Sequence, residues 1–293
     1  MGIIYPWSAV ASGLIPSTDA YPRLAARMTE TLREAPCVLA GSVFGSATRG
    51  DYTRRSDLDA FYVFPDHKMD EARRLRRRLR AMALREHVVL NLRTHSLSEA
   101  RAGGHCFGPS YSDTWTWLHD HGWMVGHPHW FYDTAHPGQV ATEMERKIRR
   151  YHLRARNFLP RLEVAGSRRG GWERLLERCH VMNVRPAHTY IAVVRMFLRW
   201  RDGRLDDDGQ GVVIRRAFGA VGFAPLLSLS TQIRNLNRAY DSLLTQVLRD
   251  ELSERAYRIT AREIFAAIAV RNVELLTAAR RVFVRPSVVS SAA

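Results

Sequence analysis

Two aspartates one residue apart, Asp57 and Asp59, are the residues of this sequence best placed to do chemistry together. They open the β-rich run DLDAFYVF, and side chains at positions i and i+2 of a strand project from the same face of a sheet. Two carboxylates held this close repel each other unless a cation lies between them. A divalent ion such as Mg²⁺, which binds carboxylate and phosphate oxygens, is therefore the expected ligand.

Two Gly-Ser pairs, Gly41-Ser42 and Gly45-Ser46, precede the aspartates. A Gly-Ser turn after a strand lets backbone amides and a hydroxyl come close to a phosphate group. Combined with the aspartates, such a turn predicts a site for a metal-bound nucleoside triphosphate. The chemistry of that site is in-line attack on a phosphoryl group clamped by metal ions. A polar hairpin without chemistry is the competing explanation.

The elements that must position these residues follow from the hydrophobic pattern. Apolar residues at helical spacing predict helices, and short apolar or alternating runs predict strands. The order is helix, strand, strand, helix, strand, over residues 20–34, 37–40, 58–64, 69–85 and 87–96. The first strand is expected to end at the glycines. This order predicts a small α/β unit with a mixed sheet and flanking helices.

The pattern changes beyond about residue 135, where long segments have helical spacing. The expected helices are 141–158, 172–201, 225–250 and 254–281. We predict an α+β protein with an α/β domain at residues 1–135, a mostly helical domain at 136–285 and a flexible tail at 286–293.

A longer pattern surrounds the aspartates. The run Gly45-Ser46-Ala47-Thr48-Arg49-Gly50, followed by Ser56-Asp57-Leu58-Asp59, resembles the signature of the polymerase-β-type nucleotidyltransferases, over about 25 residues. It is most similar to the minimal and antibiotic-modifying branch. Gly41-Ser42 lacks the following Arg-Gly and is assigned to the end of the strand.

The resemblance implies roles for the matching residues. Gly45 and Ser46 would hold the triphosphate, Asp57 and Asp59 would bind Mg²⁺ in a two-metal site, and Arg49 would assist with the phosphates. The implied reaction moves a nucleoside monophosphate, AMP being the expected one, from a nucleoside triphosphate to an acceptor hydroxyl. The helical domain would close over the nucleotide and select the acceptor.

The third carboxylate of this family, on the next strand, is missing here. Alternation along VVLNLRTHS puts Asn91 in its place, and an Asn side chain has no charge and cannot act as a general base. Glu86, at the edge of that strand, is one substitute. Glu143 or Glu145 of the helical region is another. A further alternative is a catalytically degenerate nucleotide-binding or antitoxin-like partner protein.

The acceptor is left open between a small molecule, such as an antibiotic, and an RNA such as tRNA. The formal net charge of +15 favours a polyanion, and only Lys68 and Lys147 of the 44 basic residues are lysines. A coding bias towards arginine is the alternative explanation. The helix at 69–85 concentrates six arginines in eight residues, and the segment 143–156 is similarly basic. Either a phosphate-rich acceptor or a solvated face would explain them.

Four histidines lie among tryptophans in WLHDHGWMVGHPHW: His119, His121, His127 and His129. No Cys pair accompanies them, so we expect a packing role between domains rather than a zinc site. The chain has no long apolar run, no signal-peptide pattern and three scattered cysteines, which predicts a reduced cytoplasmic protein without a membrane partner. The sequence leaves the oligomeric state open.

Overall fold

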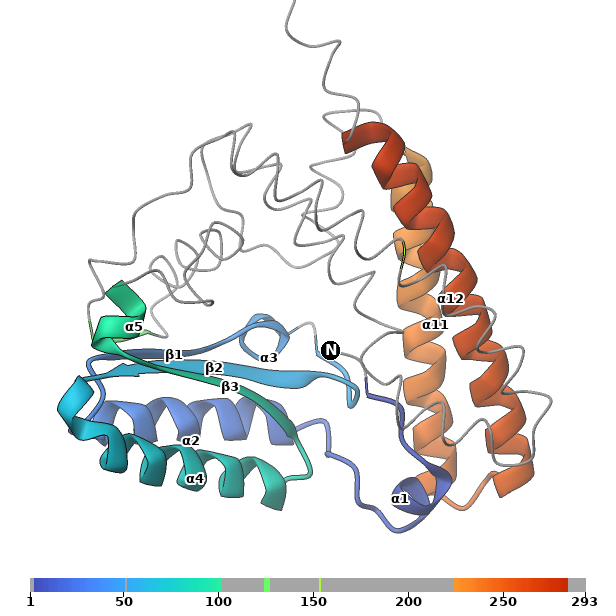
Figure 1. The fold of residues 1–293 in the computed structure, drawn as a ribbon. Coiled ribbons are helices and arrows are strands. Elements are labelled where there is room, and N and C mark those ends of the chain that lie inside the picture. Colours follow the sequence, from blue (N-terminus) through green and yellow to red (C-terminus); the bar gives the residue numbers. More distant parts are fainter. Residues whose placement is uncertain (1–2, 51, 102–123, 127–152, 154–223, 284–293) are drawn as a thin grey trace, which may run out of the picture. The chain divides into compact units, whose positions relative to one another are not determined.

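The computed structural model describes residues 3–50, 52–101, 124–126, 153 and 224–283 (Figure 1). These residues fall into two compact units. The sheet unit comprises the described residues between 15 and 126, and the helical unit comprises residues 3–14 and 224–283. The predicted domain boundary near residue 135 lies outside the described residues, as do the helices expected at 141–158 and 172–201 and the tail.

The sheet unit contains a four-stranded mixed sheet in the order β3-β2-β1-β4. The strands are β1 (Ala40–Phe44), β2 (Asp57–Phe64), β3 (Val89–Ser96) and β4 (Met124–Val125). β1 is antiparallel to β2 and to β4, whereas β2 and β3 are parallel. Because parallel neighbours need a crossover, the chain passes through η1 (Asp66–Lys68) and α4 (Met69–Arg85) between them.

Two long helices, α2 (Ala20–Glu34) and α4, cover one face of the sheet (Figure 1). Their apolar stripes, which include Leu24, Met28 and Leu79, pack in one buried cluster with Leu58 and Tyr62 of β2. Full burial of a leucine or methionine contributes about 1.5–3 kcal/mol. The Tyr62 hydroxyl also donates to the carbonyl oxygen of Ala72 at 2.5 Å, which fixes α4 to the sheet. The even-numbered residues of β2 thus face the helices.

The helices predicted at 20–34 and 69–85 are confirmed with the same bounds, and the strands at 58–64 and 87–96 with small shifts. The strand predicted at 37–40, with Gly41-Ser42 at its end, has the wrong bounds: β1 begins at Ala40 and continues through this pair to Phe44. Gly41 is needed inside that strand: a Cβ there would lie 3.0 Å from the Phe61 carbonyl oxygen and 3.1 Å from the Tyr62 Cβ. A glycine that usually signals a turn here allows close strand pairing.

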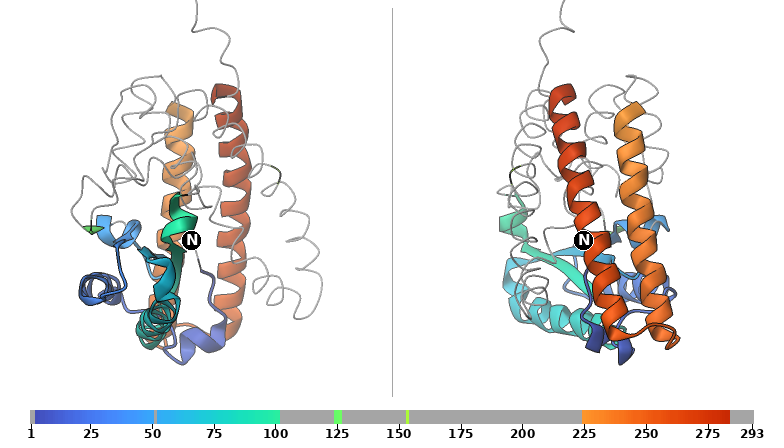
Figure 2. Two further views of the ribbon diagram at one scale, coloured as in Figure 1. Left: turned by 60° about the vertical axis from the view of Figure 1, so that its left-hand side comes forward. Right: turned by 90° about the vertical axis from the view of Figure 1, so that its right-hand side faces the viewer.

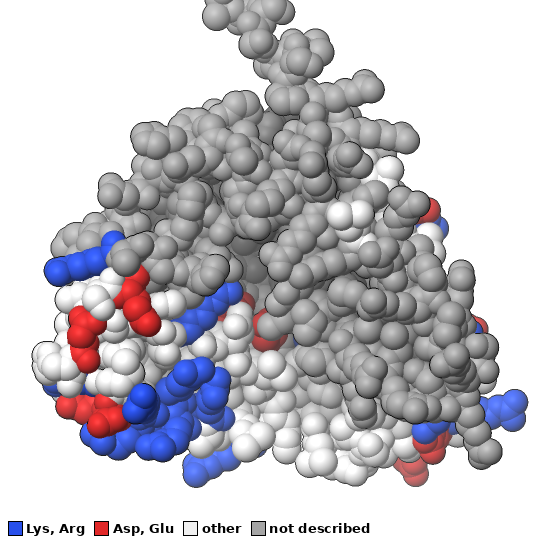
Figure 3. All heavy atoms as spheres, in the orientation of Figure 1, with Lys and Arg blue, Asp and Glu red and all other residues white. Residues whose placement is uncertain are grey.

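Shorter helices complete the sheet unit. α3 (Ser46–Arg49) follows β1, and α5 (Leu97–Arg101) follows β3. α5 lies on the side of the sheet opposite to α2 and α4 (Figure 1), whereas α3 contacts α2 and contributes Ala47 to the same buried cluster. The exposed side of α4 carries a concentration of basic residues (Figure 3).

The helical unit consists of α1 (Trp7–Ala11), α11 (Ala224–Leu248) and α12 (Glu254–Phe283). α11 and α12 lie side by side in each view of Figures 1 and 2. They correspond to the helices predicted at 225–250 and 254–281. The N-terminal segment joins them through buried tyrosines: Tyr5 N donates to the Tyr240 hydroxyl at 3.0 Å, and the Tyr257 hydroxyl donates to the Tyr5 carbonyl oxygen at 2.6 Å. The domain prediction places these first residues with the sheet.

In the part of the chain that the structure describes, no helix is long and apolar enough to cross a membrane.

Candidate active site

Asp57 and Asp59 lie on the same face of β2, as the alternation predicted, and this face points away from α2 and α4. Asp57, the first residue of β2, is almost completely buried, and Asp59 is partly buried. Burial, and next the negative charge of Asp57, raise the pKa of Asp59 to about 7. The two carboxylates lie so close together, and are buried to such an extent, that ionising both of them is unfavourable.

The loop before Asp57 is held from two directions. The Tyr21 hydroxyl of α2 lies 2.9 Å from the carbonyl oxygens of Arg54 and Ser56. Within the loop, Thr53 N donates to the Ser56 hydroxyl at 3.0 Å and Ser56 N donates to the Thr53 carbonyl at 2.9 Å. These bonds fix where β2 begins and therefore where Asp57 lies. Sequence reasoning missed Tyr21, whose only signal was a polar atom on the mostly apolar face of its helix.

Gly45 brings the end of β1 directly against Asp59. Its backbone has φ +91° and ψ −152°, a combination that side chains other than that of glycine rarely allow. A Cβ on Gly45 would lie 2.8 Å from the Asp59 Oδ2. The glycine thus keeps open the space beside the carboxylate, where a larger residue would collide with it.

Ser46, nearly buried, begins α3, and Arg49 is the last residue of that helix. The Thr48 hydroxyl donates to the Gly45 carbonyl oxygen at 3.0 Å and closes the turn. Gly41-Ser42 lies inside β1, where the Ser42 hydroxyl donates to the Val43 carbonyl. The assignment of Gly41-Ser42 to the strand is confirmed, and Gly45-Ser46 is the pair next to the aspartates.

Asn91 lies opposite Asp59 in the parallel pairing of β2 with β3. Its side-chain Nδ2 donates to the Asp59 Oδ1 at 2.6 Å. This bond favours the ionised form of Asp59, as does the positive charge of Arg93, two residues further along the same face of β3. Both effects are smaller than those of burial and of Asp57. Arg93 had no predicted role, although alternation put it on the Asn91 face.

Glu86 is occupied elsewhere. It is the residue after the last turn of α4, and its carboxylate forms ion pairs with Arg23 of α2 at 2.7 Å and with Arg27 at 3.8 Å. The structure therefore brings Asn91, and not Glu86, into contact with Asp59. The other predicted candidates, Glu143 and Glu145, lie outside the described residues, as do the four histidines at 119–129.

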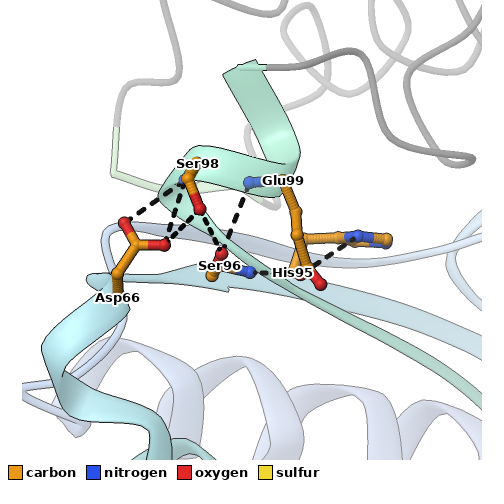
Figure 4. A network of polar contacts seen from close by, with 5 residues as sticks. All are labelled: Asp66, His95, Ser96, Ser98 and Glu99. Atoms are coloured by element: carbon orange, nitrogen blue, oxygen red, sulfur yellow. Dashed lines mark hydrogen bonds and ion pairs between the residues drawn. The ribbon is translucent and has the colours of Figure 1, made fainter.

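The end of β3 is fixed by a network of polar contacts (Figure 4). Ser96 N donates to the Glu99 Oε2 at 2.9 Å, and Glu99 N donates to the Ser96 hydroxyl at 3.3 Å, a reciprocal cap of α5. Asp66, from the start of η1, accepts hydrogen bonds from the backbone and hydroxyl of Ser98. His95 Nδ1 lies 4.0 Å from the Glu99 Oε2, and burial lowers the His95 pKa. The network joins the ends of β2 and β3 on the side away from Asp57.

The donor set suits a hard divalent cation. Two oxygen-bearing side chains converge next to a glycine that leaves room beside them, and the raised pKa of Asp59 shows that a positive charge would be favourable there. Mg²⁺ is commonly held by only one or two carboxylates together with substrate phosphates and water. Over the described ranges, no cluster of three or more His, Cys, Asp or Glu side chains could hold a metal ion by itself.

Comparison with known proteins supports this interpretation for one segment of the chain. Residues 29–94 match the family model of the nucleotidyltransferase domain, and this range includes every residue discussed above from Gly41 to Arg93. No curated protein and no solved structure gives a significant match. Residues 29–94 are therefore similar to nucleotidyltransferase domains, consistent with the polymerase-β-type superfamily, and this similarity supports a nucleotidyl transfer activity in general.

Proposed function

We propose that the chain is a Mg²⁺-dependent enzyme that transfers a nucleoside monophosphate, with AMP as the expected one, from a nucleoside triphosphate to an acceptor hydroxyl. The observation that carries the proposal is the convergence of Asp57, Asp59 and Gly45 at one point of the sheet. It combines the two carboxylates and the open turn that metal-bound phosphates require.

Asp57 and Asp59 would hold the metal. When bound, Mg²⁺ supplies positive charge to the phosphate oxygens and to the attacking and leaving oxygens. The turn at Gly45 and Ser46 would hold the triphosphate next to Asp59, because the missing Cβ leaves the backbone accessible there. Arg49, at the end of α3, is assigned to the phosphates by the family signature.

Asn91 would act as a positioning residue. Its Nδ2 donates to Asp59, so it orients that carboxylate and favours its ionised form. Asn cannot take a proton from the acceptor. Phosphoryl transfer depends mainly on positioning and on neutralising charge, so the absence of a third carboxylate at this position is compatible with catalysis.

A second candidate function is nucleotide binding without transfer, as in a degenerate enzyme or an antitoxin-like partner protein. The observation that favours it is Asn91 itself, which occupies the strand position paired with Asp59 where a carboxylate is expected. Both candidates predict binding of a nucleoside triphosphate. Only the first predicts release of pyrophosphate.

The test is transfer of label from α-labelled ATP, CTP, GTP and UTP to total tRNA and, separately, to a panel of aminoglycosides. We expect ATP to be the best donor and the Asp57→Ala/Asp59→Ala variant to be inactive. Asp70→Ala is the matched control, because Asp70 is an exposed carboxylate of the same domain, in the first turn of α4. Transfer that survives loss of both site aspartates would refute the proposed function. Nucleotide binding with no transfer to any acceptor would favour the second candidate.

A further inference from the structure

Every exposed residue of α4 between positions 73 and 80 is an arginine. The two remaining residues of this stretch, Leu75 and Leu79, are buried against the sheet. We call these exposed residues the α4 arginine surface: Arg73, Arg74, Arg76, Arg77, Arg78 and Arg80. Figure 3 shows the corresponding concentration of basic atoms over α4.

The α4 arginine surface does not belong to the site at Asp59. Tyr62 and its even-numbered neighbours in β2 face α4, whereas Asp57 and Asp59 are on the other face of the same strand. The arginines lie on the side of α4 that is turned away from the sheet, so the sheet separates them from the aspartates. They therefore need an explanation other than nucleotide binding.

A coding bias towards arginine does not explain the arrangement. On α12, two glutamates pair with arginines: Arg258 with Glu254 at 2.6 Å and Arg271 with Glu274 at 2.6 Å. On α4, the acidic residues are confined to the first turn, where Asp70 pairs with Arg73 at 3.4 Å, and Glu86 after the last turn pairs with α2. No acidic residue lies among residues 74–80. Like charges three and four residues apart destabilise a helix. A ligand that neutralises these charges would remove that cost.

The charge density fits a nucleic-acid backbone. Seven residues of α-helix rise about 10 Å, so the six arginines present about one positive charge per 1.7 Å. Double-stranded DNA carries about one negative charge per 1.7 Å of axis, so the surface has a charge density comparable to that of a nucleic-acid backbone. The planar guanidinium binds phosphate oxygens through two parallel hydrogen bonds, which makes arginine well suited to this contact.

An anionic membrane fits less well. A helix that docks on a membrane surface inserts apolar side chains between its basic ones. The exposed side of α4 has none from Arg73 to Arg80, since its leucines in this stretch are buried, and the large exposed apolar side chains of α4 are limited to Met69 and Leu84 near its two ends. On its α2 side, the surface borders a groove of about 540 Å³ that is lined by Glu30 and Glu34 together with Arg27, Arg78 and Arg85.

We infer that the α4 arginine surface docks the phosphate backbone of an RNA, separately from the nucleotide site. The choice of RNA rests on the proposed function, since transfer needs an acceptor hydroxyl and a docked RNA brings one at its end. The surface and the aspartates lie on opposite faces of the sheet. A ligand that reaches both must bend around the domain, as a flexible single-stranded RNA end does and a stiff DNA duplex does not.

The test measures RNA binding by the full chain without any nucleotide. The probe is a fluorescein-labelled 24-nucleotide RNA hairpin with a single-stranded 3′ end, followed by fluorescence anisotropy. The variant carries three substitutions, Arg74→Gln, Arg77→Gln and Arg80→Gln. We expect Kd to rise at least tenfold at about 0.1 M salt. The slope of log K against log salt should become shallower by about two to three, which corresponds to three lost phosphate contacts.

The matched control removes the same charge from the helical unit. It carries three substitutions at exposed arginines outside the sheet unit, Arg249→Gln, Arg255→Gln and Arg262→Gln. We expect its Kd to change less than twofold. Equal weakening by both variants would show that only net charge matters and would overturn the docking site.

A second experiment uses the wild-type chain and so avoids any folding defect of a variant. Bound RNA should protect the α4 arginines from modification by phenylglyoxal. If these arginines are modified equally with and without RNA, the inference is contradicted.

The docking site and the proposed function can fail separately. The Asp57→Ala/Asp59→Ala variant should bind the hairpin with wild-type Kd and transfer nothing. RNA binding through α4 without transfer to any acceptor would refute the proposed function and leave the docking site supported. Transfer to RNA that is unaffected by the α4 substitutions would overturn the docking site alone. Tighter binding to a 24-base-pair DNA duplex, or to vesicles containing phosphatidylserine, than to the hairpin would also overturn it.

Discussion

The Nδ2 of Asn91 lies 2.6 Å from the Oδ1 of Asp59, across the parallel pair β2–β3. Asn91→Ala removes a donor that favours the ionised carboxylate, so we expect kcat to fall by about tenfold to a hundredfold with little change in the nucleotide KM. Asn91→Asp instead adds a negative charge beside Asp59. It should lower Tm without Mg²⁺, and Mg²⁺ should restore that loss. A Tm loss that Mg²⁺ leaves unchanged would contradict the positioning role.

Gly45→Ala should abolish transfer and lower stability by about 2 kcal/mol or more, because it adds both backbone strain and a collision with Asp59. Gly50→Ala is the matched control. Gly50 also has a positive φ, of 75°, but a Cβ there meets nothing within 4 Å. It should cost about 1 kcal/mol and retain transfer. Chemical denaturation and label transfer on both variants separate strain from obstruction of the site.

The pKa of Asp59, about 7, gives stability a pH dependence with a definite sign. The unfolded value is near 3.9, so between about pH 4 and 7 the folded chain keeps a proton that the unfolded chain releases. Without divalent cation, stability should therefore fall as pH rises through this window. Asp59→Asn should flatten the dependence, as measured by Tm from pH 4 to 8.

Mg²⁺ binding should show the opposite trend, because the ion competes with the proton on Asp59. We expect the Tm gain from 10 mM Mg²⁺ to be large at pH 8 and small at pH 5, with apparent affinity weakening about tenfold per unit below about pH 7. Asp57→Asn and Asp59→Asn should each remove the gain. A Tm gain that is the same at both pH values would contradict a metal site at this pair.

The cap of α5 can be tested apart from the chemistry. Ser96→Ala removes the hydroxyl that accepts from Glu99 N, and it should cost about 1 kcal/mol in denaturant unfolding. Glu99→Ala should cost a similar amount, since its carboxylate accepts from Ser96 N. The double variant should cost less than the sum, because the two bonds form one cap. Strict additivity would argue against a reciprocal cap.

The parts of the fold that sequence predicted well are those fixed by local pattern. α2 and α4 each have an apolar stripe at helical spacing, and β2 is a long β-rich run, so each was placed within a residue. β1 was placed too early, on the apolar run at 37–40 with Gly41-Ser42 at its end, because a glycine-containing pair usually ends a strand. The strand conformation of Gly41-Ser42 is decided by pairing with Tyr62 and Phe61, residues distant in the chain.

In the candidate site, too, the residues with a local sequence signature were predicted, and the contacts between distant elements were not. Asp57, Asp59 and the choice of Gly45 over Gly41 followed from spacing and the family signature, and alternation singled out Asn91. The engagement of Glu86 with Arg23 depends on how α2 lies against the end of α4. The role of Tyr21 depends on how α2 lies against the loop before β2. Neither contact has a local signature, so neither could be predicted from the order of residues alone.

The bond between Tyr5 and Tyr257 spans 252 residues. At synthesis rates of about 5–20 residues per second, the ribosome adds Tyr257 to the chain on the order of 10–50 s after it has added Tyr5. During this interval Ile4, Tyr5 and Val10, all buried in the finished protein, lack the helices that cover them. The strands β1–β3 and the helices that cover them, in contrast, are complete once Ser96 has emerged. During translation, the first residues therefore cannot be buried until α11 and α12 have been made. A chain truncated before α12 would expose the apolar side chains of Ile4, Tyr5 and Val10.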